Sequence, residues 1–208
     1  MPPTTSAAES LWLDRIPPAA HAPLSAQVHV DVAVIGGGIA GVTTALLLKR
    51  AGASVAVIEA VSAGSGVTGC TTAKVSALQS TILSTIRDRH GDEAAAVYAT
   101  ASLAGVEQTA DLAASEDVEC DLERRPAFTY AADEGELDDV AEELDAARAA
   151  GLPVDSTKPD LPYPTAGAVR LDDQLQYHPV KYVRGLAAGI PGDGSHVFED
   201  TRVLSMKH

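Results

Sequence analysis

The sequence contains few cysteines and few aromatic residues. Its two cysteines, Cys70 and Cys120, lie far apart, and this number and spacing provide neither a disulfide framework nor a zinc-binding pattern. The histidines also lack the spacing of metal ligands, so we predict no metal site. Without a disulfide framework, a reducing, cytoplasmic compartment is the default expectation.

Positive charge and long hydrophobic runs are scarce as well. The 15 Lys and Arg residues are outnumbered by 29 Asp and Glu residues, which gives a net charge of -14. This balance argues against nucleic acid or an anionic membrane surface as partner, since both require basic patches. No stretch approaches the roughly 20 apolar residues of a membrane span. The N-terminus lacks the basic and apolar regions of a signal peptide.

Residues 1–29 form an N-terminal extension rich in Pro, Ala and Ser. This composition predicts irregular structure. Two alternatives stay open for it. The extension is a partly ordered tail, or the stretch LWLDRI docks on the folded body through Trp12.

A strand–helix–strand pattern follows in VDVAVIGGGIAGVTTALLLKRAGASVAVIEA, residues 30–60. Both flanking runs are rich in Val and Ile, as expected of buried parallel strands. Between them, apolar residues recur at helical spacing up to Gly52, which is a typical C-terminal helix cap. The pattern predicts a βαβ unit.

The glycines Gly36, Gly38 and Gly41 form G-x-G-x-x-G where the first strand turns into the helix. In this motif the first glycine permits the tight turn, the second lets a pyrophosphate approach the backbone, and the third lets helix and strand pack closely. The helix N-terminus offers N–H groups and partial positive charge to phosphates. The alternative is a glycine-rich packing turn without a ligand.

Glu59 ends the second predicted strand. In this position a carboxylate can accept hydrogen bonds from both hydroxyls of an adenosine ribose, and it would repel a 2'-phosphate. Together with the glycine motif, Glu59 therefore predicts a dinucleotide site for FAD or NAD rather than NADP.

The segment after Glu59 favours FAD over NAD. An NAD-binding fold would continue with a third strand and helix, whereas AVSAGSGVTGCTTAKVSA is rich in small and hydroxyl residues. We expect a largely helical stretch over 78–117 with a break at RHGDE, strands at CDLERRPAFTYAA and GAVRLDD, and a helix over 136–150 between them. A further helix is expected at HPVKYVRGLAAGI, and a final strand at SHVFEDTRVLSM.

These elements predict an α/β fold in which a Rossmann-like FAD-binding βαβ unit carries an inserted α+β substrate domain. We assign residues 30–76 and 195–208 to the partial FAD-binding domain, and residues 77–194 to the helical segment and the inserted portion.

The stretches GSGVTGCTTAKVS, GAVRLDDQLQYHPVKYVRGLA and VFEDTRV, added to the glycine motif, make the resemblance specific. The sequence resembles FAD-dependent amine and amino-acid oxidoreductases of the D-amino-acid oxidase and glycine oxidase type. It is most similar to a bacterial subgroup that often carries a C-terminal Rieske iron–sulfur domain. The resemblance extends over nearly the whole chain from about Ser10.

The resemblance implies a set of cofactor-binding residues. The three motif glycines and the amides of Ile39 and Ala40 would hold the pyrophosphate, Glu59 the ribose, and the backbone of Val203 the adenine. The segment from Ser65 to Lys74 would run along the pyrophosphate to the isoalloxazine. Its cofactor-binding members are Ser65, Gly66, Thr68, Thr71, Thr72 and Ala73. The alternative for this segment is a flexible surface loop.

Further roles carry open alternatives. Lys74 matches a basic position that stabilises reduced flavin, which makes it our catalytic candidate, or it pairs with a surface acid. Cys70 matches a site of covalent flavin attachment in some relatives, or it is only a small side chain. His178 caps the helix that starts at Pro179, or it faces substrate. Arg125 and Tyr130 lie where such enzymes bind substrate.

The family pattern continues beyond His208, so we expect this chain to be incomplete at its C-terminus, and any Rieske domain would lie in a longer form. The resulting hypothesis is an FAD-dependent oxidoreductase that transfers a hydride from a C–N bond of a small amine or amino acid. The alternatives are an NAD-dependent dehydrogenase and an inactive remnant that at most binds a nucleotide.

Overall fold

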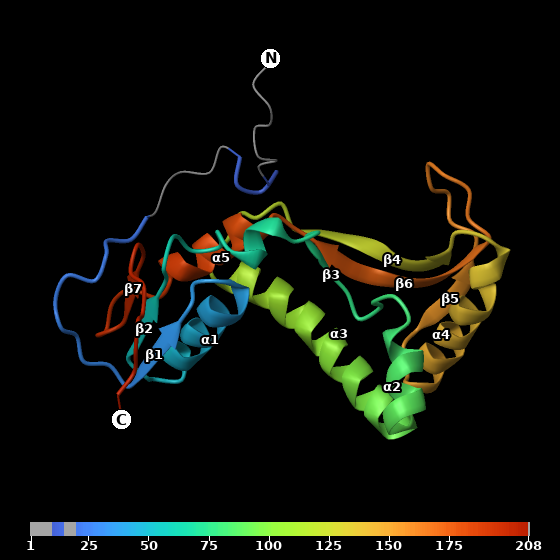
Figure 1. Ribbon diagram of the computed structural model, residues 1–208, viewed down its shortest axis with the longest axis horizontal. Coiled ribbons are helices and arrows are strands. Elements are labelled where there is room, and N and C mark those ends of the chain that lie inside the picture. Colours follow the sequence, from blue (N-terminus) through green and yellow to red (C-terminus); the bar gives the residue numbers. More distant parts are fainter. Residues whose placement is uncertain (1–9, 15–19, 208) are drawn as a thin grey trace, which may run out of the picture. The chain divides into compact units, whose positions relative to one another are not determined.

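The computed structural model describes residues 10–14 and 20–207. The chain divides into two compact units (Figure 1). Its strands are β1 Val32–Ile35, β2 Val55–Ile58, β3 Lys74–Val75, β4 Glu123–Ala131, β5 Val154–Thr157, β6 Gly167–Gln176 and β7 His196–Phe198. Its helices are α1 Ile39–Arg50, η1 Val67–Cys70, α2 Ile82–His90, α3 Asp92–Ser115, η2 Glu134–Glu136, α4 Leu137–Ala149 and α5 Pro179–Ala188.

The first unit comprises residues 1–73, 112–121 and 177–208. Its parallel sheet has the order β1-β2-β7, with Val34 opposite Val57 and Val57 opposite Val197. The central strand β2 is the most deeply buried, which explains its continuous apolar sequence. Helix α1 contacts β1 and β2 (Figure 1). The predicted βαβ unit is confirmed.

Helix α5 belongs to this first unit, whereas the sequence-based boundaries placed it in the inserted portion 77–194. The physical reason is its strongly apolar face, which is buried and contacts α1 and η1. At the start of α5, His178 caps the helix, which was one of the two alternatives for this residue. His178 is the N-cap, and its Nδ1 accepts a hydrogen bond from the amide of Lys181 at 3.3 Å.

The last strand, β7, is shorter than the predicted strand at SHVFEDTRVLSM. Asp200 has a φ of 47°, a left-handed conformation that interrupts extended backbone. Beyond β7 the chain still bonds the first unit, because the amides of Asp200 and Thr201 donate to the carbonyls of Val61 and Glu59. The predicted adenine-binding residue Val203 lies in this segment and is partly buried.

The second unit comprises residues 74–111 and 122–176. Its antiparallel sheet has the order β3-β6-β4, and β5 also pairs with β6. Helices α2 and α4 contact each other, and α4 also contacts β4, β5 and β6. Leu83, Val140, Val169 and Leu171 belong to the core of this unit. The predicted helix break at RHGDE is confirmed, because Gly91, with a φ of 85°, separates α2 from α3.

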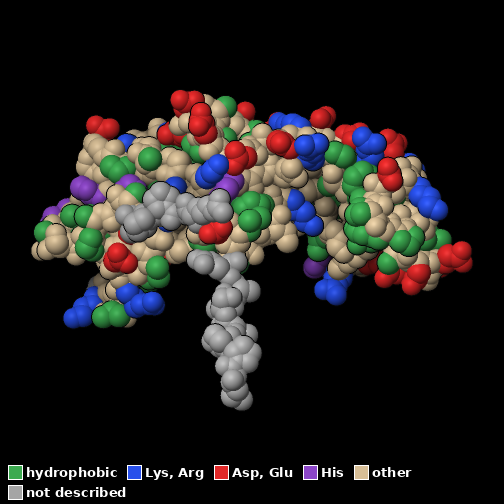
Figure 2. All heavy atoms as spheres, turned by 90° about the horizontal axis from the view of Figure 1, so that it is seen from above, with side chains coloured by type: hydrophobic (Ala, Val, Ile, Leu, Met, Phe, Trp, Pro, Cys, Tyr) green, Lys and Arg blue, Asp and Glu red, His purple; other side chains and the backbone are tan. Residues whose placement is uncertain are grey.

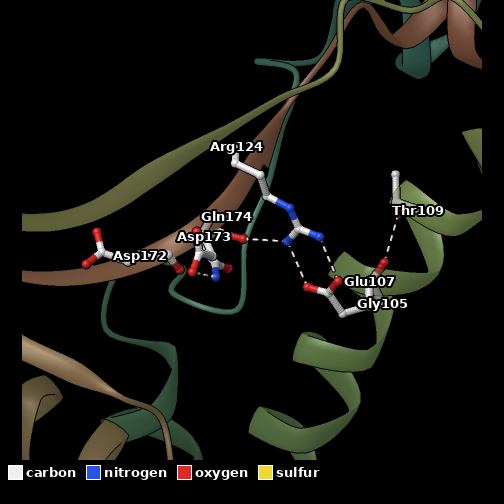
Figure 3. Close-up of polar contacts among 7 residues, drawn as sticks. All are labelled: Gly105, Glu107, Thr109, Arg124, Asp172, Asp173 and Gln174. Carbon is white, nitrogen blue, oxygen red and sulfur yellow. Dashed lines mark hydrogen bonds and ion pairs between the residues drawn. The ribbon is translucent and has the colours of Figure 1, made fainter. Parts of the chain in front are cut away.

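A β-bulge shapes the sheet of this unit. The pairing of β4 with β6 shifts between Arg125 and Ala127, where Pro126 has no N–H to donate to the ladder. On β6, Asp173 has a φ of 57° and its carbonyl accepts a hydrogen bond from Arg124 at 2.7 Å (Figure 3). Arg124 also forms a two-pronged ion pair with Glu107 of α3 (Figure 3).

The surface carries both signs of charge. On the face in Figure 2, Lys and Arg side chains lie among Asp and Glu side chains. Within residues 10–14 and 20–207, no helix is both long and apolar enough to cross a bilayer. In the same residues, no group of three or more His, Cys, Asp or Glu side chains is arranged to hold a metal ion.

Candidate cofactor-binding site

The glycine motif forms a tight turn between β1 and α1. Gly36 has a φ of 105°, which favours glycine, and its amide donates to the carbonyl of Ile58 at 2.9 Å. A Cβ atom on Gly41 would lie 2.0 Å from the carbonyl oxygen of Gly36. Glycine at these two positions therefore allows α1 to begin directly against the end of β1.

The N-terminus of α1 is built to receive a negative charge. Its N-cap is Gly38, which has no side chain to bond the first amides, and the first turn contains no acidic residue. The partial positive charge of this helix end is therefore not offset by a carboxylate within the helix. A Cβ atom on Gly38 would lie 3.3 Å from Oγ1 of Thr68, so any larger residue would crowd the space between Thr68 and the N-terminus of α1.

Thr68 brings the loop after β2 to this helix end. Its Oγ1 accepts a hydrogen bond from the amide of Ile39 at 3.1 Å. The loop also bonds the glycine turn through the amide of Gly64, which donates to the carbonyl of Gly37 at 2.9 Å. Two residues predicted to bind cofactor, Ile39 and Thr68, thus lie in contact although they are distant in sequence.

Glu59 lies directly after β2, beside the same turn. Its Oε2 accepts a hydrogen bond from the amide of Gly37 at 2.6 Å, and its Oε1 accepts one from the amide of Val61 at 2.8 Å. A carboxylate oxygen has two lone-pair directions, so each oxygen retains capacity for a hydroxyl donor. The Glu59 carboxylate is thereby held in one orientation beside the glycine turn.

The rest of the predicted cofactor segment forms a compact loop. Ser65 closes a turn, because its hydroxyl donates to the carbonyl of Ser62 at 2.7 Å, and Gly66 caps η1. Thr71 accepts a hydrogen bond from the amide of Ala73, and Thr72 is exposed. Ala73 is buried with a φ of 63°, a conformation that costs a non-glycine residue free energy.

Lys74 begins β3, in the second unit, and it lines a cavity of about 290 Å³ in that unit. Arg125, Tyr130, Tyr163 and Gln174 are among the other lining residues. Arg125 pairs with Glu123 at 2.7 Å, and the rings of Tyr130 and Tyr163 lie 5.6 Å apart. The hydrogen bond with Tyr130 raises the pKa of Tyr163. The sequence-predicted Lys74, Arg125 and Tyr130 therefore line one cavity.

The β-bulge helps to build this cavity. Gln174 is only 4% exposed, and its Oε1 accepts a hydrogen bond from the amide of Ala77 at 2.9 Å. Its Nε2 donates to the carbonyl of Asp172 at 2.9 Å (Figure 3). Bulges frequently lie beside functional sites, where they redirect side chains.

Sequence reasoning did not single out Glu199. This residue follows β7 and is 1% exposed, yet its two carboxylate oxygens accept hydrogen bonds from the amides of Ala63 and His21 at 2.6 and 2.7 Å. Burial lowers the pKa of Arg184, and the charge of Glu199 opposes that shift. The sequence signal that could have pointed to Glu199 is its place directly after the apolar residues of VFED. Its partners are set by tertiary contacts.

Comparisons with known proteins identify the family. A family model described as DAO, FAD dependent oxidoreductase, matches residues 31–208. The chain belongs to this family. FAD is the family's cofactor, and the residues of the glycine turn, the α1 N-terminus and Glu59 fit an adenosine diphosphate group by the geometry described above. This match decides in favour of FAD over NAD.

The chain is also similar to individual known proteins. The chain is 31% identical over 186 residues to "Putative Rieske 2Fe-2S iron-sulfur protein YhfW" of Bacillus subtilis (strain 168), which covers 88% of this chain and 36% of that protein. It superposes on glycine oxidase from Geobacillus kaustophilus with a TM-score of 0.63 and 21% identity, covering 85% of this chain and 48% of that one. It superposes on glycine oxidase from Bacillus cereus ATCC 14579 with a TM-score of 0.64 and 18% identity, covering 86% of this chain and 48% of that one.

The chain thus spans about half the length of the solved relatives and 36% of the curated relative. At 18–21% identity, the structural matches show the fold. They agree with the α/β fold predicted from the sequence.

Proposed function

We propose that this chain binds FAD through its first unit and belongs to an enzyme that oxidises a C–N bond of a small amine or amino acid. The observation that carries this proposal is the meeting of Gly37, Glu59 and Thr68 at the N-terminus of α1. When bound, FAD supplies the acceptor for the hydride that leaves the substrate carbon as an amine becomes an imine.

In this proposal the chain's residues divide between the two halves of the cofactor. The α1 N-terminus, with Gly36, Gly38, Ile39, Ala40 and Gly41, receives the pyrophosphate, while Glu59 receives the ribose. The backbone at Val203 meets the adenine. The loop residues Ser65, Gly66, Thr68, Thr71, Thr72 and Ala73 continue toward the flavin ring.

The cavity of the second unit is the proposed substrate site. Lys74 gives it positive charge, Arg125 adds a guanidinium that is paired with Glu123, and Tyr130 and Tyr163 supply aromatic surface with hydroxyl groups. Such a lining suits a substrate with a carboxylate beside its amine, because a guanidinium can bind a carboxylate through two hydrogen bonds. Lys74 is the proposed cation that stabilises electron-rich flavin.

Two wider expectations belong to the same proposal. A longer form of the protein would carry a Rieske domain, which the name of the Bacillus subtilis relative supports. The compartment would be the cytoplasm, consistent with the exposed cysteine Cys70 and the buried Cys120.

The test begins with binding. The 208-residue chain is titrated with FAD and with ADP by calorimetry, and we expect ADP to bind and FAD to bind weakly. The loaded chain is then mixed anaerobically with a panel of amines and amino acids while the visible flavin absorbance is recorded. Bleaching by an amine or amino acid supports the proposal. Binding of neither FAD nor ADP contradicts it.

A further inference from the structure

The N-terminal segment Ser10–Leu13 lies directly on the loop that carries η1. The indole Nε1 of Trp12 donates to the carbonyl of Thr71 at 2.7 Å, and the hydroxyl of Ser10 donates to the carbonyl of Gly69. This contact decides between the two alternatives left open by the sequence, since Trp12 docks on the folded body.

Packing reinforces these hydrogen bonds. A Cβ atom on Gly69 would lie 2.9 Å from Cδ2 of Leu13, so glycine at this position lets the Leu13 side chain approach the loop backbone. The ring of Trp12 meets that of His178 edge-on, with 5.2 Å between centroids. Trp12 is therefore held between the loop and the start of α5.

The loop that this segment holds contains Thr68, whose hydroxyl bonds the amide of Ile39 at the α1 N-terminus. The hydrogen-bonded carbonyls of Gly69 and Thr71 are one and three positions beyond Thr68 along the chain. A loop fixed at Gly69 and Thr71 presents its hydroxyls in one geometry, which lowers the entropy cost of ordering the loop when a ligand binds.

A second anchor fixes the same extension further along. The amide of His21 donates to Glu199 at 2.7 Å, and the amide of Leu24 donates to Oγ1 of Thr201 at 2.9 Å. Glu199 also holds the amide of Ala63, which precedes the loop. The extension is thus bonded both to the loop and to the segment after β7.

We propose that Ser10, Trp12 and Leu13 act as a positioning strap for the cofactor loop, with Trp12 as its principal residue. The strap rests on the proposed function, because its role is to hold Thr68, Thr71 and Thr72 in place for FAD. Trp12 acts through the loop, so it is a positioning residue.

Four variants test the strap: Trp12→Phe, Trp12→Ala, Ser10→Ala and Ser10→Thr. Trp12→Phe keeps the ring and removes one hydrogen bond, so we expect FAD affinity to fall about two- to tenfold. Trp12→Ala also removes the packing of the ring, so its FAD affinity should fall further. Ser10→Thr keeps the hydroxyl and should retain more affinity than Ser10→Ala. Leu11→Ala is the matched control, because Leu11 is 73% exposed, and it should bind FAD as the parent does.

ADP separates a positioning role from a structural one. ADP uses the glycine turn and Glu59 and shares only the Thr68–Ile39 contact with the strapped loop, whereas FAD is also expected to meet Thr71 and Thr72, so ADP affinity should fall less than FAD affinity in the Trp12 variants. A larger loss of FAD affinity than of ADP affinity supports the strap. Equal losses for both ligands, or no loss in Trp12→Ala, would overturn it. If the parent chain binds neither ligand, the proposed function fails. In that case the strap, as a device for FAD, fails with it.

Hydrogen exchange on the ligand-free chain tests whether the strap orders the loop, independently of ligand binding. If the strap orders the loop, the Ile39 amide exchanges faster in Trp12→Phe than in the parent, while amides of β4 and β6 are unchanged. Unchanged exchange at Ile39 contradicts the strap irrespective of ligand binding.

Discussion

Oε2 of Glu59 lies 2.6 Å from the amide nitrogen of Gly37, so the end of β2 is hydrogen-bonded to the glycine turn. This contact requires glycine, since a Cβ atom on Gly37 would lie 2.9 Å from Cβ of Glu59. The second oxygen of the carboxylate is fixed by the amide of Val61. Glu59 is therefore oriented by the protein itself, which would reduce the entropy lost on binding in the proposed ribose site.

The first prediction concerns the charge of Glu59. We expect Glu59→Ala to weaken ADP and FAD binding by roughly 1–3 kcal/mol, the scale of hydrogen bonds to a charged group. Glu59→Gln keeps an acceptor oxygen and should lose less. Calorimetric titration with both ligands measures the effect. Glu142→Ala, at an exposed position of α4, is the control. Unchanged affinity of Glu59→Ala for ADP and FAD would contradict the assignment of Glu59 as a ribose ligand.

The second prediction compares two glycines in helices. A methyl group on Gly41 would meet the backbone oxygen of Gly36 at 2.0 Å, so Gly41→Ala must displace α1 from β1. Overpacking of this kind typically costs about 1–3 kcal/mol or more. Gly105 of α3 has nothing within 4 Å of the corresponding position, so Gly105→Ala should gain up to about 1 kcal/mol of helix propensity. Urea unfolding of both variants measures these changes. Equal stability of the two would contradict the close approach.

Local patterns were sufficient to predict the parts of the fold whose geometry is local. The turn at Gly36, the helix break at Gly91 and the cap formed by His178 each depend on a few consecutive residues, and each is found as predicted. The strands β3 and β5 were not predicted, because they are short and acquire their extended form by pairing with β6.

Contacts between distant segments could not be predicted from one sequence. The hydroxyl of Thr68 reaches the amide of Ile39 only because the loop after β2 folds back over α1. The partners of Glu199 could not be predicted either, since Ala63 and His21 come from two remote segments. For the same reason, α5 was assigned to the insertion although its apolar face is buried in the first unit.

The third prediction concerns the buried carboxyl group of Glu143 on α4, which accepts hydrogen bonds from the amides of Leu83 and Ser84 at the start of α2. Burial raises its pKa from 4.5, and these hydrogen bonds oppose the shift. Because the folded pKa is above the unfolded one, the folded chain binds more protons in this window. The free energy of unfolding therefore falls as the pH rises from 4.5 through the raised pKa.

Glu143→Gln replaces this titrating group with a neutral one that keeps an acceptor oxygen. We expect its stability relative to the parent to improve as the pH rises from 4.5 through the raised pKa of Glu143. Urea unfolding at half-unit pH steps measures the difference. Glu142→Gln, the exposed neighbour, should follow the parent curve. Parallel curves for Glu143→Gln and the parent would show that Glu143 does not titrate differently on folding.

The last prediction concerns the cap of α5. Burial lowers the pKa of His178 from 6.5, the charge of Lys181 adds to this shift, and the charge of Asp121 opposes it. Lys181 and Asp121 are themselves ion-paired at 2.7 Å. A protonated Nδ1 cannot accept the hydrogen bond from the Lys181 amide, so charging His178 removes the cap.

The lowered pKa of His178 determines how the stability of the protein changes with pH. The folded pKa lies below the unfolded value, so the unfolded chain binds more protons between the two, and the stability contributed by neutral His178 is lost as the pH falls from 6.5 through the lowered pKa. His178→Asn keeps a good N-cap without a titrating ring. We expect the parent to lose stability on acidification in this window and His178→Asn to lose less.

Trp12 offers a second measurement of the same event. It is the protein's single tryptophan, and its ring lies 5.2 Å from that of His178. A protonated imidazole quenches a neighbouring indole, so the emission of the folded parent should fall as the pH drops below 6.5. In His178→Asn the emission should stay constant, while His29→Asn, at an exposed site, should behave as the parent does. Emission that titrates identically in His178→Asn and the parent would contradict both the ring contact and the assignment of the cap to neutral His178.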